Sequence, residues 1–94
     1  MNLDYFIDKS IEQLNRTFLK YYNTPKPISF NENSRIFEDL HTDKPRGKGQ
    51  ALEWIYEACR KLKVNPIIPD LRKKDYTIRE IATCMAKDLS KRVA

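Results

Sequence analysis

The clearest structural signal in this chain is the sequence LDYFIDKSIEQLNRTFLKYY at residues 3–22. Its apolar residues recur every three or four positions, at Leu3, Ile7, Ile11, Leu14, Phe18 and Tyr21. That spacing places them on one face of an amphipathic helix. Asn2 is a suitable N-cap, and Asn23-Thr-Pro-Lys-Pro27 ends the helix because proline disfavours helical geometry in the residue before it. The chain is therefore predicted to open with a helix that packs on a core.

Two later segments show the same helical spacing. The first is Gln50–Lys63, whose apolar residues fall on one side of a helix while its glutamates and basic residues fall on the other. The second begins with Thr77-Ile-Arg-Glu80, where Glu80 can reach back to the Thr77 amide in a capping box. From there an apolar stripe continues to about Arg92. Both segments are predicted to be helices.

The segments between these helices are predicted to be short or irregular. Residues 28–42 favour one short helix that begins after Ser29 or Ser34, preceded by an extended stretch at Ile28–Phe30. The basic stretch 43–49 contains both glycines and is predicted to be a loop, and two prolines make 64–70 a non-helical connection. The predicted fold class is all-α, a small bundle of three main helices plus one short helix with Pro-rich connections. It is expected to form a single helical domain over residues 1–94.

Length and composition bound the class of protein. The chain has 94 residues, of which 40% are hydrophobic and 33% charged, enough for one modest core. No apolar run approaches the length of a membrane span. Asp4 and Asp8 interrupt the N-terminus where a signal peptide needs an apolar stretch. We therefore expect a soluble cytoplasmic protein with no membrane partner.

Residue types that bind metals or carry out catalysis are scarce, with two cysteines and one histidine. Cys59 and Cys84 each lack the closely spaced second ligand that zinc sites use. Nothing near His41 indicates an activated thiolate for a Cys-His hydrolase. The Gly47–Gly49 stretch lacks the spacing of a phosphate-binding P-loop. We expect no catalytic residues, no metal and no cofactor, so the chain is not expected to be an enzyme.

Charge is unevenly shared along the chain. Residues 1–43 hold five Lys/Arg and seven Asp/Glu, a net of −2, whereas residues 44–94 hold thirteen and six, a net of +7. A basic half beside a weakly acidic half favours a polyanionic partner, most commonly nucleic acid. The candidate phosphate-binding residues form three clusters: Lys44, Arg46 and Lys48; Arg60, Lys61 and Lys63; and Arg72, Lys73 and Lys74. A further basic cluster lies in the last helix, at Lys87, Lys91 and Arg92.

Two hypotheses follow from this charge pattern. The first is a small basic, non-enzymatic nucleic-acid-associated protein, regulatory or accessory, that contacts the phosphate backbone of DNA or RNA. If the third and last predicted helices start on the same side, cations and backbone amides could converge on phosphates there, beside Trp54 and Tyr76. The alternative is a small helical protein-binding module, such as an inhibitor, immunity-type factor or adaptor, that acts on an acidic protein. The choice between DNA and RNA stays open, and a homodimer is possible because the stripe of the first helix also suits a dimer interface.

Overall fold

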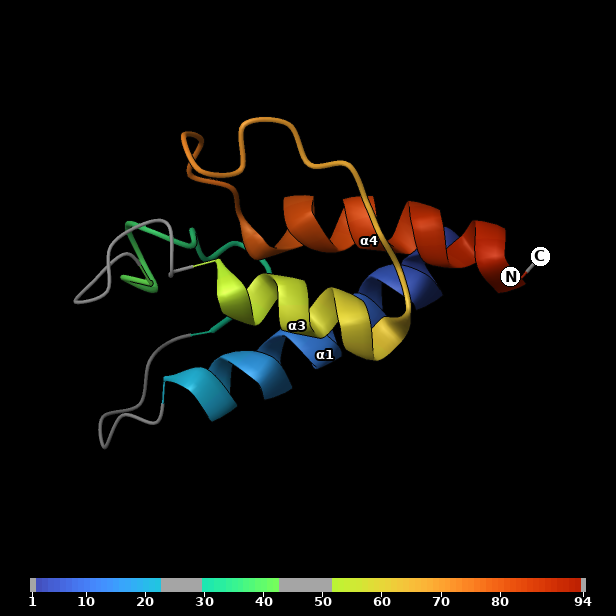
Figure 1. Ribbon diagram of the computed structural model, residues 1–94, viewed down its shortest axis with the longest axis horizontal. Helices are drawn as coiled ribbons and strands as arrows, with labels where there is room; N and C mark the ends of the chain where they lie inside the picture. Colours follow the sequence, from blue (N-terminus) through green and yellow to red (C-terminus); the bar gives the residue numbers. More distant parts are fainter. Residues whose placement is uncertain (1, 23–29, 43–51, 94) are drawn as a thin grey trace.

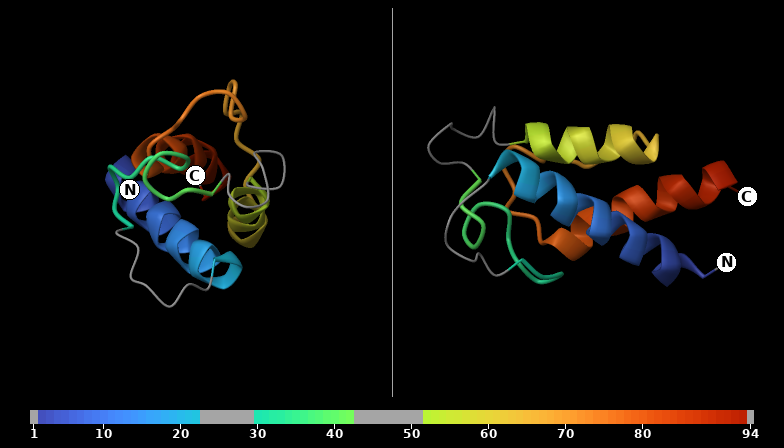
Figure 2. Two further views of the ribbon diagram at one scale, coloured as in Figure 1. Left: turned by 90° about the vertical axis from the view of Figure 1, so that its left-hand side faces the viewer. Right: turned by 90° about the horizontal axis from the view of Figure 1, so that it is seen from below.

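Three helices make up the described part of the chain (Figure 1): α1 (Leu3–Tyr21), α3 (Glu53–Leu62) and α4 (Ile78–Val93). The structure is a computed structural model and describes residues 2–22, 30–42 and 52–93. Helix α1 packs against both α3 and α4. The two views in Figure 2 agree with Figure 1 that α3 and α4 run in one direction and α1 in the other. The predicted all-α class is confirmed for these residues, which contain one isolated β-bridge and no strand.

Helix α1 follows its predicted stripe. The Asn2 side chain accepts the Asp4 amide N–H at 2.7 Å and so caps the helix as expected. The stripe buries Phe6, Ile7, Leu14 and Phe18, while Leu3 stays 38% exposed at the end of the helix. Two small polar residues are also buried in it, Ser10 and Thr17. Each hydroxyl donates to a carbonyl one turn earlier at 2.8 Å, so neither is left unsatisfied.

Helix α4 starts at the predicted capping box. The Thr77 amide N–H donates to Glu80 Oε1 at 3.0 Å, and the Glu80 amide N–H donates to Thr77 Oγ1 at 3.1 Å. These reciprocal bonds satisfy two amides that a helix start would otherwise leave open. Further along, α4 buries Ile78, Ile81 and Met85 against the core. The helix therefore begins where the sequence predicts and buries the predicted face.

Helix α3 is described from Glu53, with Leu52 as its N-cap, so the predicted start at Gln50 lies outside the described residues. It buries Trp54, Ile55 and Ala58 completely. It ends at Leu62 because Lys63 adopts a left-handed conformation with φ 57°, which breaks the helical hydrogen-bond ladder. The face predicted to be apolar is therefore the one that the structure buries.

The short helix predicted over residues 28–42 is not confirmed. Residues 23–29 lie outside the described part, and residues 31–42 form a series of turns. Two long-range contacts explain the difference, because they satisfy backbone groups that a helix would pair internally. The Asp75 carboxylate accepts the amide N–H groups of Phe37 and Glu38, and the Ile36 amide N–H donates to the Tyr76 carbonyl at 3.0 Å. The segment is thereby held across the start of α4.

An irregular connection, residues 63–77, links the end of α3 to the start of α4. It buries Val64, Leu71 and Tyr76, and the Tyr76 hydroxyl donates to the carbonyl of Pro69. The connection therefore closes one side of the core, although Ile67 in its middle is 89% exposed. In the described part of the chain, no helix is both long and apolar enough to cross a membrane.

Candidate functional site

The described candidate cations form two groups at different ends of the helices. We name them the α3-end group (Arg60, Lys61, Lys63) and the turn group (Arg72, Lys73, Lys74). Just after the α3-end group, the Asn65 amide N–H donates to Asp88 in the later half of α4. In the turn group, Lys74 Nζ lies 3.7 Å from Glu80 in the first turn of α4. Glu80 and Asp88 are eight positions apart, or about 12 Å along the helix, so the two groups lie beside different parts of α4.

The turn group lies at the end of the molecule where α3 and α4 both start (Figure 1). A common start of these two helices is the condition under which the sequence predicts that cations converge on phosphates. The third cluster, Lys44, Arg46 and Lys48, falls in the stretch 43–51, which is outside the described residues. The α3-end group lies at the far end of α3, near the last turns of α4. The structure therefore brings only the turn group, among the described candidates, to the common start of the two helices.

Ion pairs occupy some of these cations. Arg60 donates to Glu57 Oε2 at 2.6 Å, and this hydrogen bond lowers the pKa of Glu57 and raises the pKa of Arg60. Lys74 is paired with Glu80, as given above. Within the described residues no ion pair is formed by the remaining four, Lys61, Lys63, Arg72 and Lys73. Exposed ion pairs contribute little free energy, so Arg60 and Lys74 could still turn to a ligand, whereas these four residues have no pair to break within the described part of the chain.

The backbone amides at the start of α4 are not available to a phosphate. The Ile78 and Arg79 amide N–H groups donate to the carbonyls of Ser34 and Glu32 at 2.9 and 2.8 Å. The next amide, of Glu80, is held by the capping box. The expectation that these amides converge on phosphates is therefore wrong for α4, because the segment 31–42 fills that position.

The two aromatic residues considered for base stacking are both buried. Trp54 is fully buried, with its ring centroid 5.4 Å from that of Phe18 in an edge-to-face arrangement. Tyr76 is 7% exposed and is held by its hydrogen bond to Pro69. Neither of these two rings is exposed enough to stack on a nucleic-acid base, so the expected stacking by Trp54 and Tyr76 is wrong.

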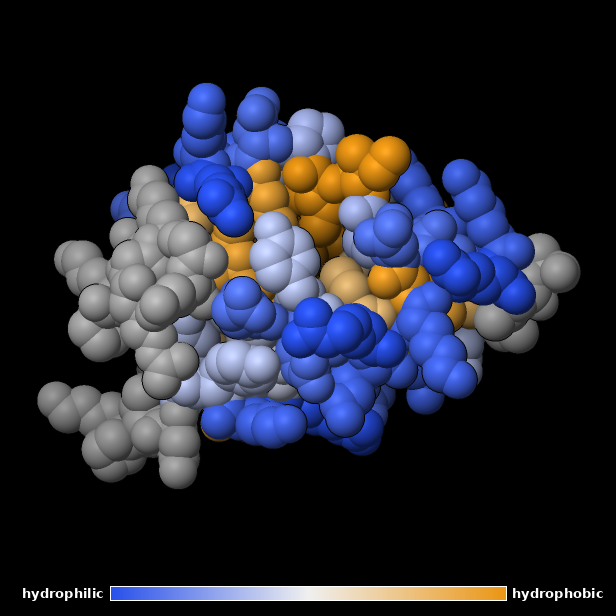
Figure 3. All heavy atoms as spheres, viewed as in Figure 1, coloured by the Kyte–Doolittle hydropathy of each residue, from blue (hydrophilic) through white to orange (hydrophobic). Residues whose placement is uncertain are grey.

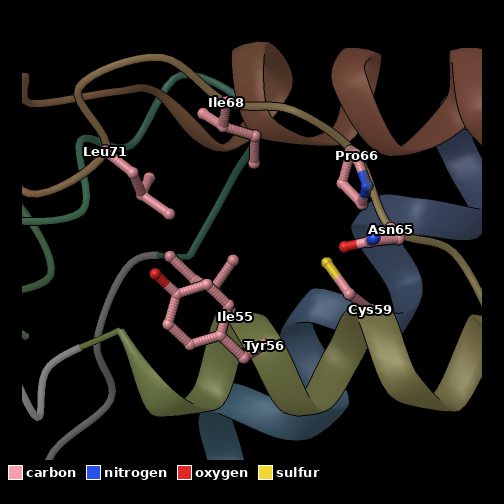
Figure 4. Close-up of a pocket in the computed structure, with 7 residues that line it drawn as sticks. All are labelled: Ile55, Tyr56, Cys59, Asn65, Pro66, Ile68 and Leu71. Carbon is pink, nitrogen blue, oxygen red and sulfur yellow. The ribbon is translucent and has the colours of Figure 1, made fainter.

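A hollow of about 220 Å³ lies between α3 and the connection, and the sequence analysis did not predict it (Figure 4). We name it the apolar hollow. Its lining comes from two elements, Ile55, Tyr56 and Cys59 of α3 and Asn65, Pro66, Ile68 and Leu71 of the connection. Burial raises the pKa of the Cys59 thiol to about 11, so the thiol stays protonated and acts as an apolar wall. The signal in the sequence was Pro66-Ile-Ile-Pro69, an apolar run whose two prolines keep it from continuing the helix, and Ile68 of this run packs against the core.

A second, more open hollow of about 310 Å³ lies beside the first, and the two share Asn65 and Pro66. We name it the lysine hollow, because Lys87 and Lys91 line it together with Ile67 of the connection. Asp88 also lines it, but its carboxylate is occupied by the Asn65 amide and by Arg92. These two hydrogen bonds, that of Asn65 first, lower the pKa of Asp88. Figure 3 shows exposed hydrophobic side chains on this face with hydrophilic ones on either side.

Among the residues that the structure describes, no three His, Cys, Asp or Glu side chains lie close enough together to hold a metal ion. His41 is exposed in the segment 31–42, whereas Cys59 is buried on α3. Comparisons with known protein families, with curated proteins and with solved structures found no match for this chain. The charged groups and the two hollows are therefore the features of the described residues that could bind a partner.

Proposed function

We propose that this chain is a small non-enzymatic protein that binds the phosphate backbone of nucleic acid through its turn group. The observation that supports this proposal is the position of Arg72 and Lys73. Both are exposed, neither forms an ion pair within the described residues, and both lie where α3 and α4 start. The cluster Lys44, Arg46 and Lys48 precedes α3 in the sequence and is included in the proposal on that ground.

Cationic side chains alone are sufficient for this kind of binding. A lysine or arginine that neutralises a phosphate releases condensed counterions, and this release accounts for most of the affinity of non-specific complexes. The amides of α4 and the rings of Trp54 and Tyr76 are occupied or buried. We therefore propose binding without reading of the base sequence, and with a strong dependence on salt.

The test is a fluorescence-anisotropy titration of labelled duplex DNA and RNA at several salt concentrations. The informative variant is Arg72→Glu/Lys73→Glu. Its matched control is Lys9→Glu/Lys20→Glu, which makes the same charge change on the exposed surface of α1. Because each phosphate contact contributes about 0.9 to the slope of log affinity against log salt, the first variant should lower the slope by about 1.8.

The control variant should keep the wild-type slope, because its two lysines lie on α1 and not in the connection that holds the turn group. An equal decrease of the salt slope in both variants would show that binding depends only on the overall charge of the chain. The proposal would be overturned if neither DNA nor RNA bound the wild-type chain at low salt.

A second candidate function is a protein-binding module for an acidic partner, and the apolar hollow is the observation that favours it. Nucleic-acid phosphates do not need a hollow lined by aliphatic side chains, whereas protein interfaces commonly place an apolar anchor in such a position. The cations of the turn group and the lysine hollow would then face carboxylates. A partner that survives nuclease treatment is expected under this candidate and not under the first.

A further inference from the structure

We propose that the apolar hollow is an anchor site, which takes one aliphatic or aromatic side chain from an acidic segment of a partner protein. This inference rests on the second candidate function and specifies its site and the chemistry of its partner. The juxtaposition that supports it is an open apolar hollow between α3 and the connection, with cations beyond both of its ends.

The hollow has room for one side chain. A dry protein cavity of about 150 Å³ is large enough to bind benzene, and this hollow measures about 220 Å³. Ile55 and Ile68 face it from opposite elements, as Figure 4 shows, and the protonated Cys59 thiol adds a further apolar wall. The Tyr56 hydroxyl and the side-chain amide of Asn65 are polar groups in the lining that can orient a partner backbone.

The hollow is already formed without a partner. Pro66 and Pro69 restrict the backbone on its outer side, so little conformational entropy is lost when a ligand enters. The connection does not fill the hollow with its most exposed apolar residue, because Ile67 lines the neighbouring lysine hollow and remains 89% exposed. A partner that covered both hollows would bury this isoleucine as well.

Charge indicates which partner fits. At one end of the apolar hollow, Leu71 is followed directly by Arg72 and Lys73, which form no ion pair within the described residues. At the other end, the lysine hollow presents Lys87 and Lys91. Two nearby acids on helices are bonded, Glu57 to Arg60 and Asp88 to Arg92, whereas Glu53 of α3 and Asp70 of the connection are exposed and form no ion pair within the described residues. Positive charge therefore dominates on both sides, which favours carboxylates flanking the anchor residue.

The test is an NMR titration of the full chain, labelled with nitrogen-15, with two synthetic peptides. One is a short peptide of aspartate and glutamate with a single central leucine, and the other has serine in place of that leucine. The leucine peptide should shift the amide signals of Ile55, Cys59 and Ile68. It should also bind about 10- to 100-fold more tightly than the serine peptide, because burial of one leucine side chain supplies that difference.

A pair of matched variants locates the site. Tyr56→Ser removes one wall of the hollow and should weaken binding of the leucine peptide about tenfold. Tyr5→Ser makes the same change on α1 and should leave binding within about twofold of wild type. Tyr56 and Tyr5 are 40% and 48% exposed, so neither substitution opens the core, and circular dichroism would verify that both variants fold.

Each alternative outcome has a definite meaning. Equal binding of the two peptides would overturn the anchor site while leaving recognition of acidic partners by the basic groups intact. If neither peptide binds, the anchor site and the second candidate function are both rejected. Shifts at Ile55, Cys59 and Ile68 caused by duplex DNA and not by the leucine peptide would assign the hollow to nucleic acid instead.

Discussion

Cys59 shows how burial changes the chemistry of a single residue. The side chain lies on the apolar face of α3 and is 8% exposed, and this burial raises the pKa of its thiol to about 11. The helical spacing of residues 50–63 predicts an apolar face on this helix, and Cys59 is buried on that face. Its position in the wall of a hollow was not predictable, because the opposite wall comes from a different element.

The raised pKa of Cys59 predicts slow alkylation. In a Cys84→Ser variant, only about a thousandth of Cys59 is thiolate at about pH 8, so labelling should be far slower than for a free thiol. Iodoacetamide labelling followed by mass spectrometry measures the rate. Urea should restore the rate of an unperturbed thiol, and rapid labelling of the folded chain would contradict the burial of this residue.

Asp75 supplies the side-chain acceptor for two of the hydrogen bonds that tie the segment 31–42 to the start of α4. Its carboxylate accepts the amide N–H of Phe37 at 2.8 Å and that of Glu38 at 3.2 Å. Asp75→Ala leaves both amides without this acceptor, and we expect a loss of about 1–3 kcal/mol in the free energy of unfolding. Urea denaturation measures the loss. Asp8→Ala on the exposed surface of α1 is the control, and it should change stability by less than about 0.5 kcal/mol.

At the scale of the element, α4 carries the most informative local signal. The capping box at its start was predicted from Thr77 and Glu80 alone, because both partners lie within one turn. The hydrogen bond from the Thr77 amide is the main cause that lowers the pKa of Glu80. A carboxylate with a lowered pKa stabilises the folded state above its ordinary pKa, and this contribution is lost as the pH falls through the lowered value.

The lowered pKa of Glu80 predicts how the substitution Glu80→Gln changes stability at different pH values. Above pH 4.5, the ordinary pKa of the group, the variant should be less stable than wild type, because the neutral amide is a weaker acceptor for the Thr77 N–H. Below that pH the two proteins should converge as Glu80 becomes protonated in the wild type. Urea midpoints measured at neutral and at acidic pH give the comparison. A gap that stays constant across this range would contradict the assigned role of the carboxylate.

The segment 31–42 shows where local patterns fail. Its apolar spacing predicted a short helix, but its backbone pairs with residues about 40 positions later in the chain. A backbone N–H that donates to a distant carbonyl or carboxylate is no longer available for an i→i−4 bond. The same contacts fill the start of α4, so one tertiary arrangement overturned both the predicted helix and the predicted amide contribution to phosphate binding.

At the scale of the whole molecule, the basic half of the sequence divides into separate groups. The net charge of +7 over residues 44–94 indicated a basic second half, but it did not show how the cations are arranged. The α3-end group lies near Asp88 and the turn group near Glu80, two residues about 12 Å apart along the axis of α4. This separation exceeds the Debye length of about 8 Å at physiological salt, so the two groups should act independently.

Independence of the two groups can be measured. If nucleic acid binds as proposed, Lys61→Glu/Lys63→Glu should reduce affinity less than Arg72→Glu/Lys73→Glu does. The variant that combines all four substitutions should lose binding free energy equal to the sum of the two separate losses, within about 0.5 kcal/mol. Anisotropy titrations at physiological salt provide all three values. A loss well below or above the sum would indicate a single coupled surface and contradict the separation of the groups.

Residue order alone determined the three long helices, the N-cap at Asn2, the capping box at Thr77 and the cationic character of the second half. Each of these depends on residues within one or two helical turns of one another, so the spacing of side chain types is sufficient to reveal it. Tertiary structure alone decided which helix ends meet, which amides are occupied, and that an apolar hollow opens between α3 and the connection. These features depend on contacts between distant parts of the chain, whose geometry no local pattern specifies.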